Sequence, residues 1–351
     1  MKNTITFKRV WQQLKADLIG KDSYRGITLT YAWLANQFGH ISLGFIPSFL
    51  LYRFTETDDF YAALYVSAAW LLFEIYNFLG PLLSKKESDS EVVFIPKNMS
   101  YKFEPKWGNV AFDTFTDVCF FTFGAFLFSL TINEGENSTV IIVLIVLIVL
   151  FVYLLFASRY WFMTKMYQFY ARFPFQFRLS QWDFDIHIDH KKKVDQFLKS
   201  IENEGSHLLI YGDFGTGKTS LGVGILNELS IKHNSCLYKN GIKMFNSFFD
   251  DAVVAPYEIW NWRTADFLMI DDINPSKPIE NELVSPQKLL SFIDTMQSEN
   301  KTNRDTLIRK NVIWILGSKS TADASITDKW EQLLLEIGVD ERKISTINLS
   351  K

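Results

Sequence analysis

Cysteine is nearly absent from this chain of 351 residues. It occurs only at Cys119, in an apolar run, and at Cys236, in the charged second half. Two isolated cysteines exclude both a disulfide framework and a zinc site with paired cysteine spacing. Their scarcity fits a reducing cytoplasm around the second half of the chain.

Three other features are missing. Residues 1–26 are polar and basic and lack the apolar core of a signal peptide, so we expect later hydrophobic segments to bring the chain to a membrane. The second half lacks a strongly basic strip, which argues against a nucleic-acid partner; the run 191–193 is interpreted as a solvated helix start or a lipid contact. No solenoid repeat or low-complexity tract is found.

Long apolar runs are present, all in the first half. A helix needs roughly 20 apolar residues to cross the hydrocarbon core of a bilayer, and four stretches reach about that length: 29–52, 60–83, 110–132 and 139–157. The alternative is that they are buried core helices of a soluble protein.

The charges between these runs favour membrane spans. Lys and Arg are concentrated before the first run, between the second and third, and after the fourth, whereas residues 133–138 carry only acids and residues 53–59 carry Arg53 among three acids. Cytoplasmic loops are enriched in Lys and Arg. We therefore expect an integral multi-pass protein of the plasma membrane (the inner membrane of a bacterium) with four spans and both termini in the cytoplasm.

The predicted organisation has four parts: a cytoplasmic segment (1–28), a transmembrane domain (29–157), a linker (158–182) and a second domain (183–351). The linker interleaves aromatic residues with Arg and Lys, which favours an interfacial segment in contact with membrane lipid. The alternative is a helical extension of the fourth span that ends near Pro174. The two interpretations are compatible.

Four titratable side chains interrupt the apolar runs: His40, Glu74, Asp113 and Asp117. Charged groups inside a bilayer are costly and therefore need a reason to be there. Together with Gly44 and Gly124 they loosely resemble the pattern of the VanZ-like membrane family. Three roles stay open for this polar site: hydrogen bonds that hold the helices together, a proton site or a metal site.

The second half contains a phosphate-binding motif. An apolar strand at 208–211 leads into the pattern G-x-x-x-x-G-K-[ST], followed by an amphipathic helix. The glycines let backbone N–H groups face the phosphates of ATP, Lys218 reaches the β- and γ-phosphates, and Thr219 binds Mg²⁺. The predicted nucleotide-binding residues are Gly212, Asp213, Phe214, Gly215, Thr216, Gly217, Lys218, Thr219 and Ser220.

A second motif, which is acidic, lies about fifty residues downstream. Four apolar residues end in Asp271 and Asp272, which is typical of a buried strand that presents carboxylates at its end. Asp271 is predicted to orient Mg²⁺, and Asp272 to position or deprotonate the attacking water. The alternative for Asp272 is a loop-start carboxylate without a catalytic role; Glu280 and Glu282 are weaker candidates for the same task.

Further along, a strand is expected at 311–316, then Ser318, a helix at 327–337, Arg342 and a final strand at 344–349. This order over residues 183–351 resembles the AAA+ ATPases, particularly their helicase-loader-like branch. The resemblance implies that Ser318 senses the γ-phosphate and that Arg342 acts on ATP bound to a neighbouring subunit, hence a homo-oligomer. Arg304 and Arg309 are rivals for that role. The P-loop run is also similar to that of the membrane-associated KAP ATPases.

The sequence thus predicts a four-span α-helical bundle followed by an α/β P-loop NTPase domain with a mostly parallel sheet. The helical lid that usually follows in AAA+ proteins is not expected. The favoured function is ATP hydrolysis coupled to the membrane bundle. The alternatives are a nucleotide-gated effector or pore with little turnover, and a transporter or membrane enzyme that uses the intramembrane polar residues. The loop at 272–286 is a candidate contact for an unidentified protein partner.

Overall fold

The computed structural model describes residues 4–18, 27–83, 101–132, 137–201, 204–248, 258–273, 285–294, 299–317 and 324–350. It divides into two compact units, of which one comprises Thr6–Met163 and the other Met1–Ile5 with Thr164–Lys351. We call them the helical unit and the α/β unit. Ser318, Glu280 and Glu282 lie outside the described residues.

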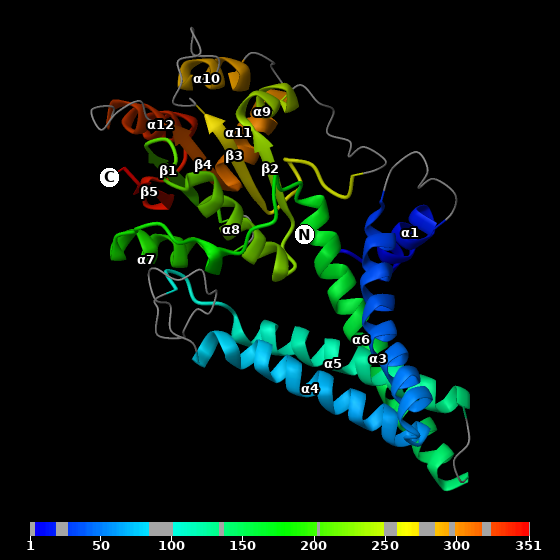
Figure 1. Cartoon of the computed structure of the whole chain (residues 1–351). Coiled ribbons are helices and arrows are strands. Elements are labelled where there is room, and N and C mark those ends of the chain that lie inside the picture. The colour runs from blue at the N-terminus through cyan, green and yellow to red at the C-terminus, as the bar shows by residue number, and fades with distance from the viewer. Residues whose placement is uncertain are drawn as a thin grey trace. The chain divides into compact units, whose positions relative to one another are not determined.

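Long helices make up the helical unit (Figure 1). They are α1 (Phe7–Leu18), α3 (Leu29–Thr55), α4 (Asp59–Leu83), α5 (Trp107–Ile132) and the greater part of α6 (Asn137–Tyr170). The last four occupy the four predicted apolar runs. The fourth is longer than the predicted 139–157, because the helix continues to Tyr170, as the alternative interpretation of the linker predicts.

Three of the described helices are long and apolar enough to cross a membrane: Asp59–Leu79, Trp107–Ile132 and Asn137–Tyr170. Helix α3 is as long but less apolar, because Asn36, Gln37 and His40 follow one another within two turns. The structure therefore supports three candidate spans on length and composition, where the sequence analysis expects four.

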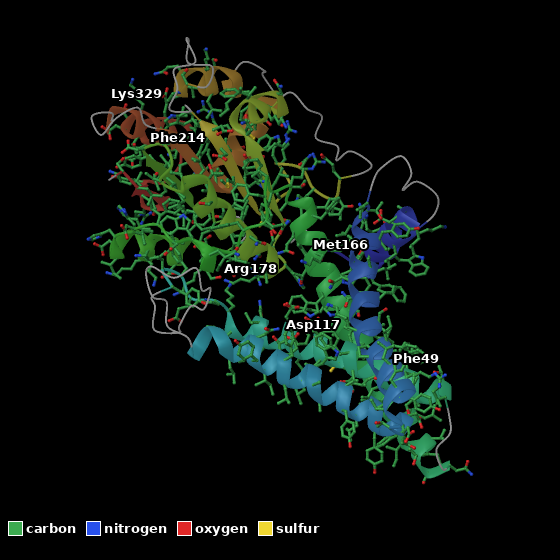
Figure 2. The ribbon with its side chains drawn as sticks, in the orientation of Figure 1. Phe49, Asp117, Met166, Arg178, Phe214 and Lys329 are labelled. Atoms are coloured by element: carbon green, nitrogen blue, oxygen red, sulfur yellow. The ribbon has the colours of Figure 1, made fainter. Side chains whose placement is uncertain are left out.

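The tightest packing in the helical unit joins α3 to α5 through two glycines. A Cβ atom at Gly44 would lie 1.9 Å from the backbone oxygen of Phe121, and one at Gly124 would lie 2.0 Å from that of Ile41. Small residues of this kind let helix backbones approach closely. Beyond the crossing, the Phe128 ring packs against three rings of α3, those of Phe45, Phe49 and Tyr52 (Phe49 is labelled in Figure 2).

The α/β unit contains a five-stranded parallel sheet in the order β2-β3-β4-β1-β5. Its strands are β1 (His207–Gly212), β2 (Cys236–Asn240), β3 (Phe267–Ile273), β4 (Asn311–Gly317) and β5 (Ile344–Asn348). The central strands are buried on both faces, so they appear in the sequence as continuous apolar runs. Four of these strands are predicted from the sequence; β2 is not, because it is short and ends in Lys239 and Asn240.

Because β4 lies between β1 and β3, its carboxyl end lies between the P-loop and the acid pair. Helix α8 (Lys218–Ile231) starts in the P-loop and packs on β1 to β4, while α9 (Gly241–Ser247) packs on β2 and β3. The remaining elements are α7 (Ile188–Phe197), α10 (Pro286–Asp294), α11 (Glu299–Arg309), α12 (Ala324–Ile337), η1 (Leu179–Gln181) and η2 (Glu341–Lys343).

Residues 164–182, predicted to lie in an interfacial linker, contribute to the interior of the α/β unit. Met166, Tyr167, Leu179 and Trp182 are among its buried side chains. Polar contacts fix the same segment on α8: the Gln168 side chain donates to Asn227, whose own amide donates to the backbone oxygen of Phe177. The segment is therefore part of the α/β unit's packing.

Candidate functional site

The P-loop connects β1 to α8 through three glycines whose backbone favours glycine over other residues. Gly212 has φ +147°, and Gly215 and Gly217 each have φ +79°. These torsions are strained for residues with a Cβ. The loop thus presents backbone N–H groups at the start of α8, where the helix dipole favours an anion.

Lys218 and Thr219 open α8 and face this loop. The Lys218 ammonium donates to the backbone oxygens of Gly212 and Asp213 at 2.8 and 2.6 Å. Burial lowers the pKa of Lys218, and the Asp213 and Asp271 carboxylates oppose that shift. The cation is thereby held beside the loop.

Asp271, at the end of β3, is almost completely buried, and donors surround its carboxylate. Thr219 Oγ1 donates to Asp271 Oδ1 at 3.1 Å, and the Asp272 N–H donates to the same oxygen at 2.8 Å. Tyr238 donates its hydroxyl to Oδ2 at 3.0 Å. Burial raises the pKa of Asp271, and the three donors oppose the rise. A threonine hydroxyl bonded to a buried aspartate suits a Mg²⁺ site.

Asp272 is held in an unusual backbone conformation. Its φ is +56°, and the pairing of β3 with β4 shifts register between Ile270 and Ile273. Consecutive side chains of a regular strand point to opposite faces. The irregularity lets Asp271 and Asp272 face the same cavity. Strain of this kind at a non-glycine residue is typical of functional sites.

Two residues of β2 that the sequence analysis misses meet the acid pair. Tyr238 and Asn240 are two positions apart and therefore share one face of the strand. Tyr238 bonds Asp271, as described, and the Asn240 amide donates to Asp272 Oδ2 at 2.7 Å. The sequence contains one signal for this segment, because Asn240 before Gly241 is typical of a helix start. The Asn240 side chain accepts from the Ile242 N–H and so caps α9.

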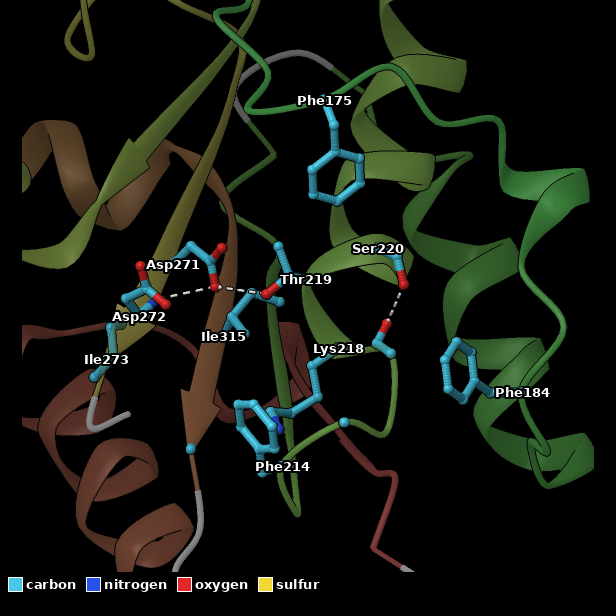
Figure 3. Close-up of a pocket in the computed structure, with 13 residues that line it drawn as sticks. Phe175, Phe184, Phe214, Lys218, Thr219, Ser220, Asp271, Asp272, Ile273 and Ile315 are labelled. Carbon is cyan, nitrogen blue, oxygen red and sulfur yellow. Dashed lines mark hydrogen bonds between the residues drawn. The ribbon is translucent and has the colours of Figure 1, made fainter. Parts of the chain in front are cut away.

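A cavity of about 510 Å³ joins these groups. Figure 3 shows the two carboxylates on one side of the start of α8 and Phe184 on the other. Three exposed aromatic residues, Phe175, Phe184 and Phe214, contribute to the lining, as do Ile273, Ile315 and Gly317. Trp182 braces the loop, because its indole N–H donates to the backbone oxygen of Gly217 at 2.9 Å. Among the described lining residues, Lys218 is the only cation.

The structure places Arg342 far from this cavity. It lies in η2, just before β5, and its guanidinium forms an exposed ion pair with Asp340 at 2.7 Å. Because β5 runs parallel to β1, Arg342 lies at the amino ends of the strands, whereas the P-loop follows their carboxyl ends. The five residues of β5 separate the two ends by roughly 16 Å at about 3.3 Å per residue. Arg342 thus has no direct access to the cavity of its own chain.

The predicted polar residues of the helical unit come from three helices. His40 Nε2 lies 3.5 Å from Asp117 Oδ1 and 3.2 Å from Asn36 Nδ2. Asp113 is one turn from Asp117 on α5, and Glu74 is on α4. Among the described residues, no group of three His, Cys, Asp or Glu side chains is placed to hold a metal ion.

Six chains of solved structures are similar to this one, among them the two that follow. The crystal structure of the DnaC helicase loader is 16% identical with a TM-score of 0.32, and the match covers 48% of this chain and 96% of that one. The crystal structure of DnaI is likewise 16% identical with a TM-score of 0.32, covering 52% and 93%. No known family matches the sequence. Function resides in the site and not in the fold.

Proposed function

We propose that this chain is a membrane-anchored ATPase that binds Mg-ATP in the α/β unit. The observation that carries the proposal is the hydrogen bond from Thr219 of the P-loop to the buried Asp271 of β3, beside Lys218. ATP phosphates would contact the backbone N–H groups of residues 212–219 and the Lys218 ammonium. Thr219 would ligate Mg²⁺, with Asp271 orienting the ion and its waters.

Hydrolysis is assigned to Asp272. Its carboxylate lines the cavity beside Asp271 and would position the attacking water, and Asn240 orients it. The described lining residues provide only one cation, whereas phosphoryl transfer develops negative charge that a second cation stabilises. A neighbouring subunit would supply that cation. Arg342, exposed just before the amino end of β5, is our candidate. The active form would be a homo-oligomer.

The oligomer claim has a direct test in mixed subunits. Lys218→Ala and Arg342→Ala should each abolish ATP turnover alone, because one lacks the phosphate ligand and the other the trans cation. Mixed in equal amounts, they should recover about a quarter of wild-type turnover, since some interfaces pair an intact P-loop with an intact arginine. Lys329→Ala, which changes an exposed cation on α12 with no assigned role, is the control. Full activity of Arg342→Ala would remove this role.

The membrane placement is a further part of the proposal: α3 to α6 cross the bilayer four times, with both termini in the cytoplasm. Three candidate spans and the charge pattern support it. A cysteine at Thr57 should react with a membrane-impermeant maleimide added outside cells, and one at Ser350 should react only after lysis. The native Cys119 and Cys236 are buried and give little background. Labelling of both positions from the same side would refute the topology.

A nucleotide-gated membrane effector with little turnover is the second candidate. The single cation among the described lining residues favours it, because phosphoryl transfer without a second cation is slow. Tight Mg-ATP binding without phosphate release by the full chain would select this function over hydrolysis. Phosphate release that disappears in Asp272→Asn would select hydrolysis.

A further inference from the structure

The imidazole of His40 in the helical unit has two polar partners and contacts two aromatic rings of α5. The Phe121 ring meets it edge-on at 5.0 Å between centroids, and the Phe120 ring lies at 6.4 Å and nearly parallel. The side chain is 19% exposed. Both rings come from α5, and an apolar surrounding strengthens the electrostatic interactions of the imidazole.

Both polar partners approach the same nitrogen. Asn36 Nδ2 lies 3.2 Å from His40 Nε2, and Asp117 Oδ1 lies 3.5 Å from it. An amide N–H needs a lone pair on Nε2, whereas a carboxylate needs a proton there. The two contacts therefore require Nε2 without and with a proton, respectively. The other nitrogen, Nδ1, is buried and has no hydrogen-bond partner among the described residues.

The backbone holds this arrangement in place. Gly44, one turn after His40, contacts the backbone of Phe121, which is one turn after Asp117. Trp70 of α4 stacks on Phe121 at 4.3 Å between centroids and donates to the backbone oxygen of Leu43 at 2.8 Å. Three helices thus fix the distance between His40 and Asp117 without a further polar contact between them.

The other charged groups near the pair are acids. Asp113 lies one turn before Asp117 on α5, and Glu74 lies on α4. On α3 itself the nearest other charged residue is Arg53, about 20 Å along the axis at 1.5 Å per residue. Cys119 and Tyr153 are further titratable groups of this part of the bundle.

We propose that His40 and Asp117 form a proton-binding site among the apolar helices, in which the imidazole exchanges Asn36 for Asp117 when it takes up a proton. In the neutral state Nδ1 carries the ring proton and Nε2 accepts from Asn36. A proton from water then binds Nε2, the Asn36 contact breaks, and the new N–H donates to Asp117 Oδ1. The imidazolium and the carboxylate form a neutral pair, and no other bond changes.

The test is nitrogen NMR of the full chain, labelled with ¹⁵N-histidine, in lipid nanodiscs without nucleotide. The chain has five histidines, and the His40 signal is the one lost in His40→Gln. We expect a neutral ring with its proton on Nδ1 at about pH 8, and a doubly protonated ring at about pH 6. A neutral ring with its proton on Nε2, or no change over this range, would overturn the proposal.

Two variants should move the charged population in opposite directions. Asp117→Asn removes the acceptor of the charged state, so the doubly protonated fraction at about pH 6 should fall roughly tenfold or more. Asn36→Leu removes the donor of the neutral state and should raise that fraction. Gln37→Leu, one position away, is the control and should have no effect. Equal spectra for Asp117→Asn and wild type would refute the site. Because no nucleotide is present, failure of ATP hydrolysis leaves the result unaffected.

Discussion

The acid pair of the α/β unit and the His40–Asp117 pair of the helical unit differ in how completely their polar atoms are matched. Thr219, Tyr238 and the Asp272 N–H together satisfy both oxygens of Asp271. His40 instead has two competing partners on Nε2 and none among the described residues on Nδ1. A carboxylate whose two oxygens both accept hydrogen bonds keeps its charge, as a metal site requires. An imidazole with competing partners on one nitrogen can change its charge.

The largest effect should come from the glycine at the crossing of α3 and α5. In Gly44→Ala the new Cβ would meet backbone 1.9 Å away, so the helices must separate. We expect a loss of about 3 kcal/mol or more in the free energy of unfolding, measured by denaturant titration in detergent. The same separation should eliminate the contact between His40 and Asp117.

Gly39→Ala is the matched control on the same helix, because a Cβ there has nothing within 4 Å. It should be neutral or slightly stabilising, since alanine favours a helix over glycine by about 1 kcal/mol. Equal losses in the two variants would mean that the crossing does not hold the helical unit together.

A second pair of glycines tests the P-loop. In Gly217→Ala a Cβ would lie 2.5 Å from the Phe184 ring, in addition to the strain of φ +79°, whereas Gly215 has the same φ and open space around it. Without nucleotide, Gly215→Ala should cost about 1–2 kcal/mol, the penalty of a left-handed residue. Gly217→Ala should cost more. Identical unfolding midpoints would show that the contacts of Phe184 and Trp182 with Gly217 do not constrain the loop.

His207 provides a contrast to His40. It is completely buried on β1, and Trp314 Nε1 donates to its Nδ1 at 3.1 Å. Burial lowers the pKa of His207 from 6.5 to about 3. Between these values the unfolded chain binds a proton that the folded chain excludes. The free energy of unfolding should therefore fall as the pH falls from about 6.5 toward 3, and this contribution is complete above pH 6.5.

His207→Gln keeps an acceptor for Trp314 and cannot titrate in this range. Its stability should depend less on pH than that of the wild type, as measured by denaturant titration of the full chain in detergent. Parallel pH profiles for the two proteins would contradict the buried neutral histidine.

The smallest effect is expected at Arg342. Its ion pair with Asp340 is fully exposed, although the guanidinium lowers the pKa of Asp340 to about 2. Exposed pairs contribute little to folding. Arg342→Ala should therefore leave the unfolding midpoint unchanged while removing turnover, which separates a role between subunits from a role in folding. A clear loss of stability would indicate that the pair is structural.

The sequence was most informative where one segment carries its own signal. The P-loop, the strand ending at Asp271 and the apolar helices follow from local patterns of glycine, charge and apolar length. It was less informative where partners come from distant segments. Tyr238 and Asn240 meet the acid pair only because β2 lies beside β3. Asp271 and Asp272 face the same cavity only because the strand is irregular at Asp272. The contact between His40 and Asp117 similarly depends on where two helices cross.

Polar residues also affect how many membrane spans composition predicts. Asn36, Gln37 and His40 make α3 less apolar than its neighbours, so composition marks three candidate spans instead of four. The aromatic and basic residues of 164–182 favour a membrane interface by composition, but Tyr167 and Trp182 are buried in the α/β unit. Composition describes how residues partition between water and lipid, whereas burial also depends on which surface folds over them.

The central claim is tested most directly by phosphate release from Mg-ATP by the full chain in nanodiscs, compared with Asp272→Asn. We expect both proteins to bind Mg-ATP with similar affinity, because Asp271, Thr219 and Lys218 are unchanged. Turnover should fall by about a hundredfold or more in Asp272→Asn, since the carboxylate that positions water is lost. Equal turnover in the two proteins, or none in the wild type despite tight binding, would contradict the account.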